Sequence, residues 1–152
     1  MKRIVSLLAS STEIVCSLDF RGQLVGRSHE CDYPESVKIL PICTEVKIPT
    51  DGTSFEIDQR VKAIVQEGLS VYRVKSEILQ RLKPDVIITQ TQCEVCAVSL
   101  KDVEAAVCEL VDSRPEIVSV EPNTLADIWA DIQRVADALE KPERGIRLVG
   151  EL

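Results

Sequence analysis

Three short polar segments hold most of the side chains that could bind a ligand or react. They are Ser10–Thr12, His29–Tyr33 and Gln90–Cys96, and they contain the only histidine and three of the six cysteines. Hydroxyl and amide groups bind polar or anionic ligand groups, whereas an imidazole and thiolates bind transition metals. The three segments therefore predict a binding site for a polar ligand, a metal or both.

The spacing of the histidine and cysteines permits a metal site. His29-x-Cys31 together with Cys93-x-x-Cys96 supplies one nitrogen and three sulfur ligands, the set of a Cys₃His zinc site. Cys93 and Cys96 are equally compatible with a redox-active dithiol at the start of a helix. Packed loop thiols without chemistry are a third interpretation, and the sequence leaves all three open.

The hydroxyl residues near the N-terminus have two interpretations. Ser10 and Glu13 match the S-x-x-E pattern of a helix capping box, which needs no ligand. Ser10, Ser11 and Thr12 could also bind a polar or anionic group through hydroxyls and backbone N–H. The segment has no glycine, so it is neither a phosphate-binding P-loop nor a GxGxxG fingerprint. We expect capping first, with ligand contact as an added role.

Catalysis has little support in the sequence. A single histidine gives no spacing that indicates a Ser-His-Asp nucleophile. Glu30 and Asp32 could act as paired carboxylates, but neighbouring charges in a loop are commonly solvated. We predict that the protein is not an enzyme.

Composition narrows the choice of partners. The chain has 152 residues, a formal net charge of −7 and 3% aromatic residues. An acidic chain without a basic stretch and with few stacking platforms is not expected to bind nucleic acid. No apolar run approaches the roughly 20 residues of a membrane-spanning helix. The length suits a single domain.

The first residues imitate a secretory signal without completing one. The apolar stretch Ile4–Ala9 is shorter than the usual minimum of about 7 residues, and Glu13 follows it closely. We read Met1 as the start of a cytoplasmic chain, or of one from which a leader was removed, in which case the protein is periplasmic or otherwise extracytoplasmic. Cys16, Cys43 and Cys108 lie in apolar patterns and are expected to be small core residues.

Alternating apolar runs and amphipathic windows predict an α/β fold, a mostly parallel sheet flanked by helices that ends in a long helix. A Rossmann-like lobe fits this order. Residues 39–42 form a further apolar segment. The expected strands are 4–8, 24–26, 71–74, 86–89 and 117–120, and the expected helices are 54–67, 76–82, 99–111 and 124–140, after a first helix that begins after Ser10 and is closed by Gly22.

Parallel topology predicts where the polar segments meet. Loops that leave the carboxyl ends of parallel strands line one edge of the sheet, and helix N-termini point their free N–H groups there. We therefore expect residues 9–12, 28–33 and 90–96 to converge on that edge.

The same loops carry a resemblance to a known family. The runs RIVSLLASSTEIVCSL, LVGRSHECDYP and LKPDVIITQTQCEVCAVSLKDV resemble the cobalamin-binding branch of the helical-backbone (class III) periplasmic binding proteins of ABC importers. The match covers residues 3–140, with Ala9 where the family usually has proline. It implies two α/β lobes joined by a long helix, with the ligand held between the lobes.

The resemblance implies an organisation for this chain. Residues 1–122 correspond to an N-terminal ligand-binding lobe, 123–141 to the linking helix, and 142–152 to a tail or the start of a missing second lobe. A second lobe or a second copy of the chain would complete the cleft, and an importer permease is the expected partner. Glu56, in the segment SFEIDQR, is a candidate for docking onto that permease.

The resemblance also implies the ligand contacts. Cobalamin, another corrinoid or a similar metal chelate is the expected ligand, with Tyr33 against the flat corrin ring and His29 near its cobalt. The expected ligand-binding residues are Ser10, Ser11, Thr12, His29, Glu30, Asp32, Tyr33, Gln90 and Gln92.

Two functions therefore remain to be weighed. The first is non-enzymatic capture of a corrinoid for an importer. The second is a cytoplasmic zinc- or iron-binding or thiol-redox module on the same fold, using His29, Cys31, Cys93 and Cys96.

Overall fold

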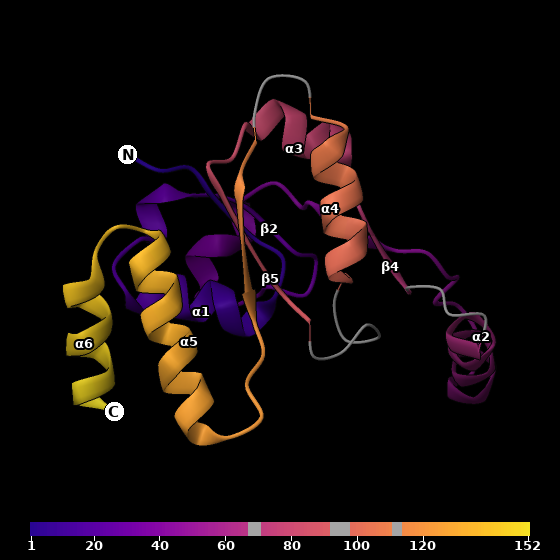
Figure 1. The fold of residues 1–152 in the computed structure, drawn as a ribbon. Helices are drawn as coiled ribbons and strands as arrows, with labels where there is room; N and C mark the ends of the chain where they lie inside the picture. Colours follow the sequence, from indigo (N-terminus) through magenta and orange to yellow (C-terminus); the bar gives the residue numbers. More distant parts are fainter. Residues whose placement is uncertain (67–70, 92–97, 111–113) are drawn as a thin grey trace.

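The computed structural model describes residues 1–66, 71–91, 98–110 and 114–152 (Figure 1). The strands are β1 (Ile4–Ser6), β2 (Leu24–Arg27), β3 (Thr44–Val46), β4 (Tyr72–Val74), β5 (Val86–Gln90) and β6 (Glu116–Val120). The helices are α1 (Ala9–Ser17), α2 (Ser54–Gln66), α3 (Ser76–Leu82), α4 (Leu100–Cys108), α5 (Leu125–Ala138) and α6 (Pro142–Glu151), with 3₁₀ turns at Arg21–Gln23 and Glu35–Ile39.

A parallel sheet in the order β2-β1-β5-β6 forms the centre of the fold. β5 has the sequence VIITQ and is buried along its whole length, as expected for a strand covered on both faces. β5 pairs with β1 on one side, where Val86 lies opposite Ile4, and with β6 on the other, where Ile88 lies opposite Val118. The predicted α/β class and parallel sheet are confirmed.

Two apolar clusters cover the two faces of this sheet. One joins sheet residues such as Ile88 to α1 and α5, with Val15 and Val135 fully buried. The other joins Ile87 to α3 and α4. Figure 1 shows α1, α5 and α6 on one side of the sheet and α3 and α4 on the other. Burial of these side chains, at about 25 cal/mol per Å² of apolar surface, fixes the three layers.

The first helix differs from the sequence-based expectation at both ends. It begins at Ala9 after Leu8, whose extended backbone serves as the N-cap without a side-chain hydrogen bond. The predicted Ser10–Glu13 capping box is therefore wrong, because Ser10 is already inside the helix and a cap must lie outside it. Gly22 does not close the helix, which ends at Ser17 and is followed by Asp19 at a φ of 61°.

An antiparallel pair, β3 and β4, lies outside the main sheet and leads into α2. The apolar segment 39–42 contributes only an isolated bridge between Ile42 and Arg27, and the strand begins at Thr44 instead. A capping box starts α2: Glu56 accepts the Thr53 N–H at 2.7 Å, and Thr53 Oγ1 accepts the Glu56 N–H at 3.3 Å. α2 stands away from the sheet in Figure 1.

The final part of the chain forms two antiparallel helices. Thr124 and Asp127 make a capping box at the start of α5. α5 ends at Ala138, and Pro142 lies in the first turn of the next helix, α6. α6 is fixed to α1 because Arg144 donates to the carbonyl of Leu18 at 2.8 Å and its guanidinium lies 4.6 Å from the centre of the Phe20 ring. Residues 142–151 thus form a helix that packs against α1 and α5.

The cysteines expected in the core have different environments. Cys43 is buried and Cys16 is half-buried, but Cys108 is exposed near the end of α4, where the expectation is wrong. The last turn of α4 points this side chain outward because Val107 and Leu110 take the inward positions. Among the helices described, none has both the length and the apolar character needed to cross a bilayer.

Candidate functional site

The carboxyl ends of three neighbouring strands bring two of the predicted segments together. The N–H of Ser28 donates to the carbonyl of Ser6 at 2.9 Å, and the N–H of Leu7 donates to the carbonyl of Ile88 at 2.9 Å. These bonds continue the pairing of β2 with β1 and of β1 with β5 beyond the strands. The segments after β1 and β2 therefore leave the sheet side by side, next to Gln90 at the end of β5.

At this edge the chain leaves the neighbouring strands β1 and β5 toward opposite faces of the sheet. α1 follows β1 on one face of the sheet, and α4 follows β5 on the other. Chains that leave two adjacent strands toward opposite faces open a crevice between them, and ligands of open α/β sheets bind at such points. The structure thus places a candidate ligand site between the ends of β1 and β5.

The N-terminal turn of α1 lies at this crevice. The first N–H groups of a helix have no intrahelical partners and carry a partial positive charge. Ser10 is exposed, whereas Ser11 and Thr12 are buried. The Ser11 hydroxyl is fully buried yet makes no hydrogen bond to any described residue, and the same is true of Thr89 on β5. Buried hydroxyls without a protein partner, one on α1 and one on β5, are suited to hydrogen bonding with water or a polar group.

Arg27, which the sequence reading overlooked, holds the loop after β2 in place. Its side chain is buried, and its guanidinium donates to three backbone carbonyls. The acceptors are Ser28 at 3.0 Å, Cys31 at 2.9 Å and Lys38 at 3.1 Å. A charged residue within the otherwise apolar strand LVGR was the available signal. The loop it holds includes a cis peptide bond between Tyr33 and Pro34.

The ring of His29 is oriented by Thr44 of β3. Nδ1 lies 2.7 Å from Thr44 Oγ1, while the Thr44 hydroxyl donates its proton to Ser28 Oγ at 3.0 Å. The backbone N–H of His29 also donates to Thr44 Oγ1, at 3.0 Å. A hydroxyl can both donate and accept, so Thr44 holds the ring in place whichever ring nitrogen carries the proton.

Two further side chains flank His29. Nε2 lies 3.2 Å from Oε1 of Glu30, and the ring centre lies 5.1 Å from that of Tyr72 on β4. Nε2 itself is buried, and the Glu30 carboxylate lies within ion-pair distance of it. The antiparallel β3–β4 pair thus supports one wall of the candidate site.

The environment of Cys31 makes it poorly suited to bind a metal. It is 1% exposed, and its sulfur accepts the Thr12 hydroxyl at 3.0 Å. Burial raises the pKa of its thiol, although the Thr12 hydrogen bond opposes the shift. Because the thiolate is the form that binds metals and reacts, a raised pKa disfavours both roles. Asp32 and Tyr33, in contrast, are exposed.

The last predicted segment is only partly described. Gln90 is buried at the end of β5, and Gln92, Cys93 and Cys96 lie outside the described residues. In the described part of the chain, no group of three or more His, Cys, Asp or Glu side chains could hold a metal ion. Glu56, the predicted docking residue, is exposed at the start of α2, where its carboxylate also accepts the Thr53 hydroxyl at 2.9 Å.

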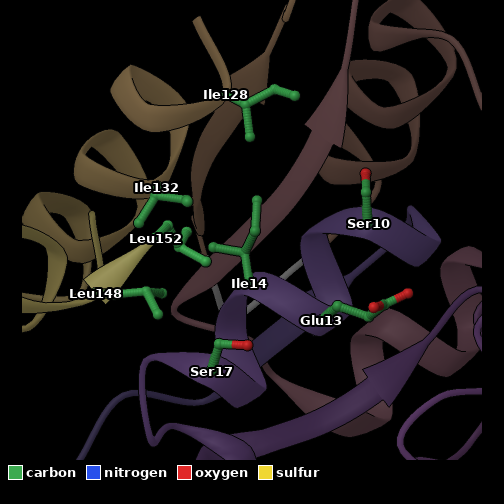
Figure 2. A pocket seen from close by; sticks show the side chains of 8 residues that line it. All are labelled: Ser10, Glu13, Ile14, Ser17, Ile128, Ile132, Leu148 and Leu152. Carbon is green, nitrogen blue, oxygen red and sulfur yellow. The ribbon is translucent and has the colours of Figure 1, made fainter. Parts of the chain in front are cut away.

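A groove of about 280 Å³ runs between α1, α5 and α6, beside the crevice. Figure 2 shows Ile14, Ile132, Leu148 and Leu152 close to one another among the side chains that line it. Ser10 belongs to both the groove and the ligand edge. Ile128 is 41% exposed and Leu152 is 74% exposed. Apolar side chains gathered at a surface in this way mark interaction sites.

The fold is similar to that of solved periplasmic binding proteins. The apo periplasmic heme-binding protein RhuT from Roseiflexus sp. RS-1 matches with a TM-score of 0.68 at 24% identity. A possible iron-binding (periplasmic solute-binding) protein from Staphylococcus epidermidis matches with 0.69 at 20% identity. The periplasmic vitamin B12 binding protein BtuF from Vibrio cholerae matches with 0.62 at 21% identity.

The three matches cover 99% of this chain but only 45%, 46% and 46% of the solved chains, in the same order. The chain therefore spans less than half the length of these proteins. No protein-family model matches the sequence, and no curated protein matches it. The chain has the fold of one half of a periplasmic binding protein.

Proposed function

We propose that this chain is a ligand-binding lobe of an ABC-importer solute-binding protein that captures a metal chelate without chemical conversion. The observation that carries the proposal is the point between β1 and β5 where the chain leaves the two strands toward opposite faces of the sheet, with the start of α1 beside the loop after β2. The likeness to heme-, iron- and vitamin B12-binding proteins supports a metal chelate as the ligand class. Within that class we propose cobalamin or another corrinoid, from the resemblance of the HEC and QCEVCAV segments.

The described residues have complementary roles in this proposal. The exposed ring of Tyr33 packs against the flat macrocycle, and Ser10 and the first turn of α1 bind a polar group at its periphery. His29, whose ring Thr44 holds in place, lies near the metal centre in this proposal. Asp32 and Gln90 lie at the same edge, and Gln92 is proposed to join them.

The proposed partners follow from the same function. We place the protein outside the cytoplasm, since the similar solved proteins are periplasmic, and the cytoplasmic alternative has no such support. An importer permease would dock on the exposed surface that includes Glu56. A second copy of the chain is proposed to complete the cleft and cover the α1–α5–α6 groove, because one lobe provides only half the contact area. Sedimentation equilibrium tests the last point, and a monomer at all concentrations would contradict it.

Titration with cobalamin, hemin and a ferric siderophore tests the function directly. We expect a visible-spectrum shift and calorimetric heat with cobalamin at a dissociation constant of about 10 µM or weaker, since half the cleft is present. The variant Tyr33→Ala should weaken binding, because its ring is 65% exposed at the site. The control Phe55→Ala removes a ring that is 70% exposed on α2 and should leave binding unchanged. No response to any of the three chelates at high micromolar concentration would reject the proposal.

A further inference from the structure

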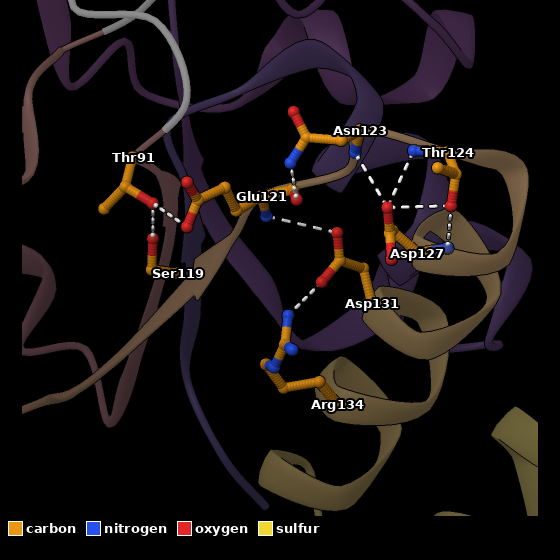
Figure 3. A network of polar contacts seen from close by, with 8 residues as sticks. All are labelled: Thr91, Ser119, Glu121, Asn123, Thr124, Asp127, Asp131 and Arg134. Atoms are coloured by element: carbon orange, nitrogen blue, oxygen red, sulfur yellow. Dashed lines mark hydrogen bonds and ion pairs between the residues drawn. The ribbon is translucent and has the colours of Figure 1, made fainter.

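We propose that Asp131 and Glu121 position the ligand edge by coupling α5 to the end of β5. Asp131 lies on α5, Glu121 follows β6, and Thr91 follows β5 (Figure 3). The proposal rests on the proposed function only for its consequence on ligand binding. The coupling itself is a property of the protein alone and can be measured without a ligand.

The first contact joins α5 to the segment after β6. Oδ2 of Asp131 accepts the backbone N–H of Glu121 at 3.2 Å. Oδ1 of the same carboxylate pairs with the guanidinium of Arg134, one turn further along the helix. The Asp131 side chain is 4% exposed, so the carboxylate and its bond to the Glu121 N–H are partly shielded from water, whereas the Arg134 side chain is 51% exposed. A hydrogen bond that is shielded in this way is stronger than one at the surface.

The second contact joins the segment after β6 to the end of β5. Oε2 of Glu121 accepts the hydroxyl of Thr91 at 3.2 Å. The Ser119 hydroxyl of β6 donates to the oxygen of the same Thr91 at 3.4 Å. Thr91 directly follows Gln90 and precedes the segment QCEVC. Glu121 thus contacts α5 through its backbone N–H and the end of β5 through its side-chain carboxylate.

Helix capping does not explain the position of Asp131. The start of α5 is already satisfied by Asp127, which accepts the N–H groups of Thr124 at 2.7 Å and of Asn123 at 3.1 Å. Asp131 lies one turn later, where a buried carboxylate costs solvation energy. Burial raises its pKa, against the opposing charge of Arg134. A residue kept at this cost, and not needed for the cap, is suited to holding two segments in register.

Through these contacts, a movement of α5 would change the position of the end of β5 at the ligand edge. A displacement of α5 relative to the sheet moves the Glu121 backbone, and Glu121 in turn moves Thr91. Asp131 is a positioning residue in this scheme, since it acts on the site through Glu121.

A double-mutant cycle on the ligand-free protein tests the coupling. The variants are Asp131→Ala, Thr91→Val and their combination, each unfolded in urea. If Glu121 connects the two positions, the unfolding equilibrium constant of the double variant should differ from the product of the two single-variant effects. We expect that difference to be about threefold or more. The non-multiplicative part should disappear when the cycle is repeated with Glu121→Ala. Asp137→Ala, an exposed position on the same helix, is the control and should combine multiplicatively with Thr91→Val.

Two results would overturn the proposal. One is a multiplicative Asp131–Thr91 cycle, and the other is a coupling that persists without the Glu121 side chain. Neither result depends on whether the protein binds cobalamin.

Cobalamin titration measures the consequence for the site. Asp131→Ala should weaken binding by about threefold to tenfold at a temperature where the variant is fully folded. Asp131→Asn keeps an oxygen that can accept the Glu121 N–H and should restore wild-type binding. Equal binding by wild type and Asp131→Ala would contradict the role at the ligand edge. Absence of binding by the wild type would instead count against the proposed function, and the cycle above would still decide the coupling.

Discussion

The hydroxyl of Thr12 donates a hydrogen bond of 3.0 Å to the sulfur of Cys31, which joins the first turns of α1 to the loop after β2. The two residues are 19 positions apart in the sequence and both are buried. Their contact ties the start of α1 to the loop that carries His29 and Tyr33. It also places the Cys31 thiol inside the protein, where it is shielded from solvent reagents.

We expect the thiols to react at very different rates with iodoacetamide at about pH 8. Burial raises the pKa of Cys43 to about 12, so only about one molecule in 10,000 carries its thiolate at that pH. The Cys31 pKa is also raised by burial. Exposed Cys108 should therefore be labelled at least about 100-fold faster than Cys43, as measured by mass spectrometry of the separated peptides. Labelling in denaturing urea is the control, and comparable rates in the folded protein would contradict the buried positions.

The substitution Gly26→Ala should destabilise the protein. A Cβ at this position would lie 2.6 Å from Cys43 Sγ and 2.7 Å from a methyl group of Leu82, both too close for real contacts. Overpacking of this kind costs about 1–3 kcal/mol in the free energy of unfolding, measured in urea. Gly22→Ala is the matched control, because nothing lies within 4 Å of its added Cβ. Equal stability of the two variants would contradict the close packing of β2 against Cys43 and Leu82.

The substitution Arg27→Lys should loosen the loop that carries His29 and Tyr33. The single ammonium group of a lysine cannot replace the two guanidinium nitrogens that donate to the carbonyls of Ser28, Cys31 and Lys38. We expect a loss of about 2–3 kcal/mol in unfolding free energy, together with faster proteolysis after residue 30.

The control for Arg27 is Arg81→Lys on α3, where the arginine is exposed. Such a surface change should stay within about 0.5 kcal/mol. An Arg27→Lys variant as stable as this control would show that the three carbonyl contacts contribute little.

Glu45 should make the β3–β4 pair sensitive to acid. Lys75 and Arg73 hold the pKa of its carboxyl below the ordinary 4.5. A lowered pKa means that folding favours the ionised form, so the contribution of Glu45 is present above pH 4.5 and is lost as the pH falls through the folded pKa. Glu45→Gln should therefore unfold at lower urea concentration than wild type at neutral pH, and the difference should vanish in acid. A constant difference at every pH would contradict the ion pairs, and Glu104→Gln on the exposed surface of α4 is the control.

Much of the fold could be predicted because local patterns and burial agree. The run VIIT is apolar on both faces, and it becomes the fully buried β5. The pairs Thr53–Glu56 and Ser99–Asp102 start helices where they stand in the sequence. The Ser10–Glu13 pair has the same pattern and fails, because the connection from β1 makes Leu8 the cap. A pattern of residues cannot indicate where the preceding strand turns.

The candidate site was only partly predictable. Parallel topology was sufficient to expect the segments after β1 and β2 at one edge, and His29 and Ser10 among their residues. The roles of Arg27 and Thr44 were not predictable, because their partners come from loops and from the antiparallel pair β3–β4. The α6 helix was missed because its apolar residues are few and its stability depends on packing against α1 and α5.

The sequence by itself determined most of the strands and helices up to α5, the buried β5 and the acidic character of the chain, because these depend on residue type and local spacing. The tertiary structure decided which polar side chains meet. It brought Thr12 to Cys31, His29 to Thr44, and Asp131 through Glu121 to Thr91. Hydrogen bonds act over about 3 Å, so contacts between residues distant in the sequence exist only after the packed layers have fixed their positions.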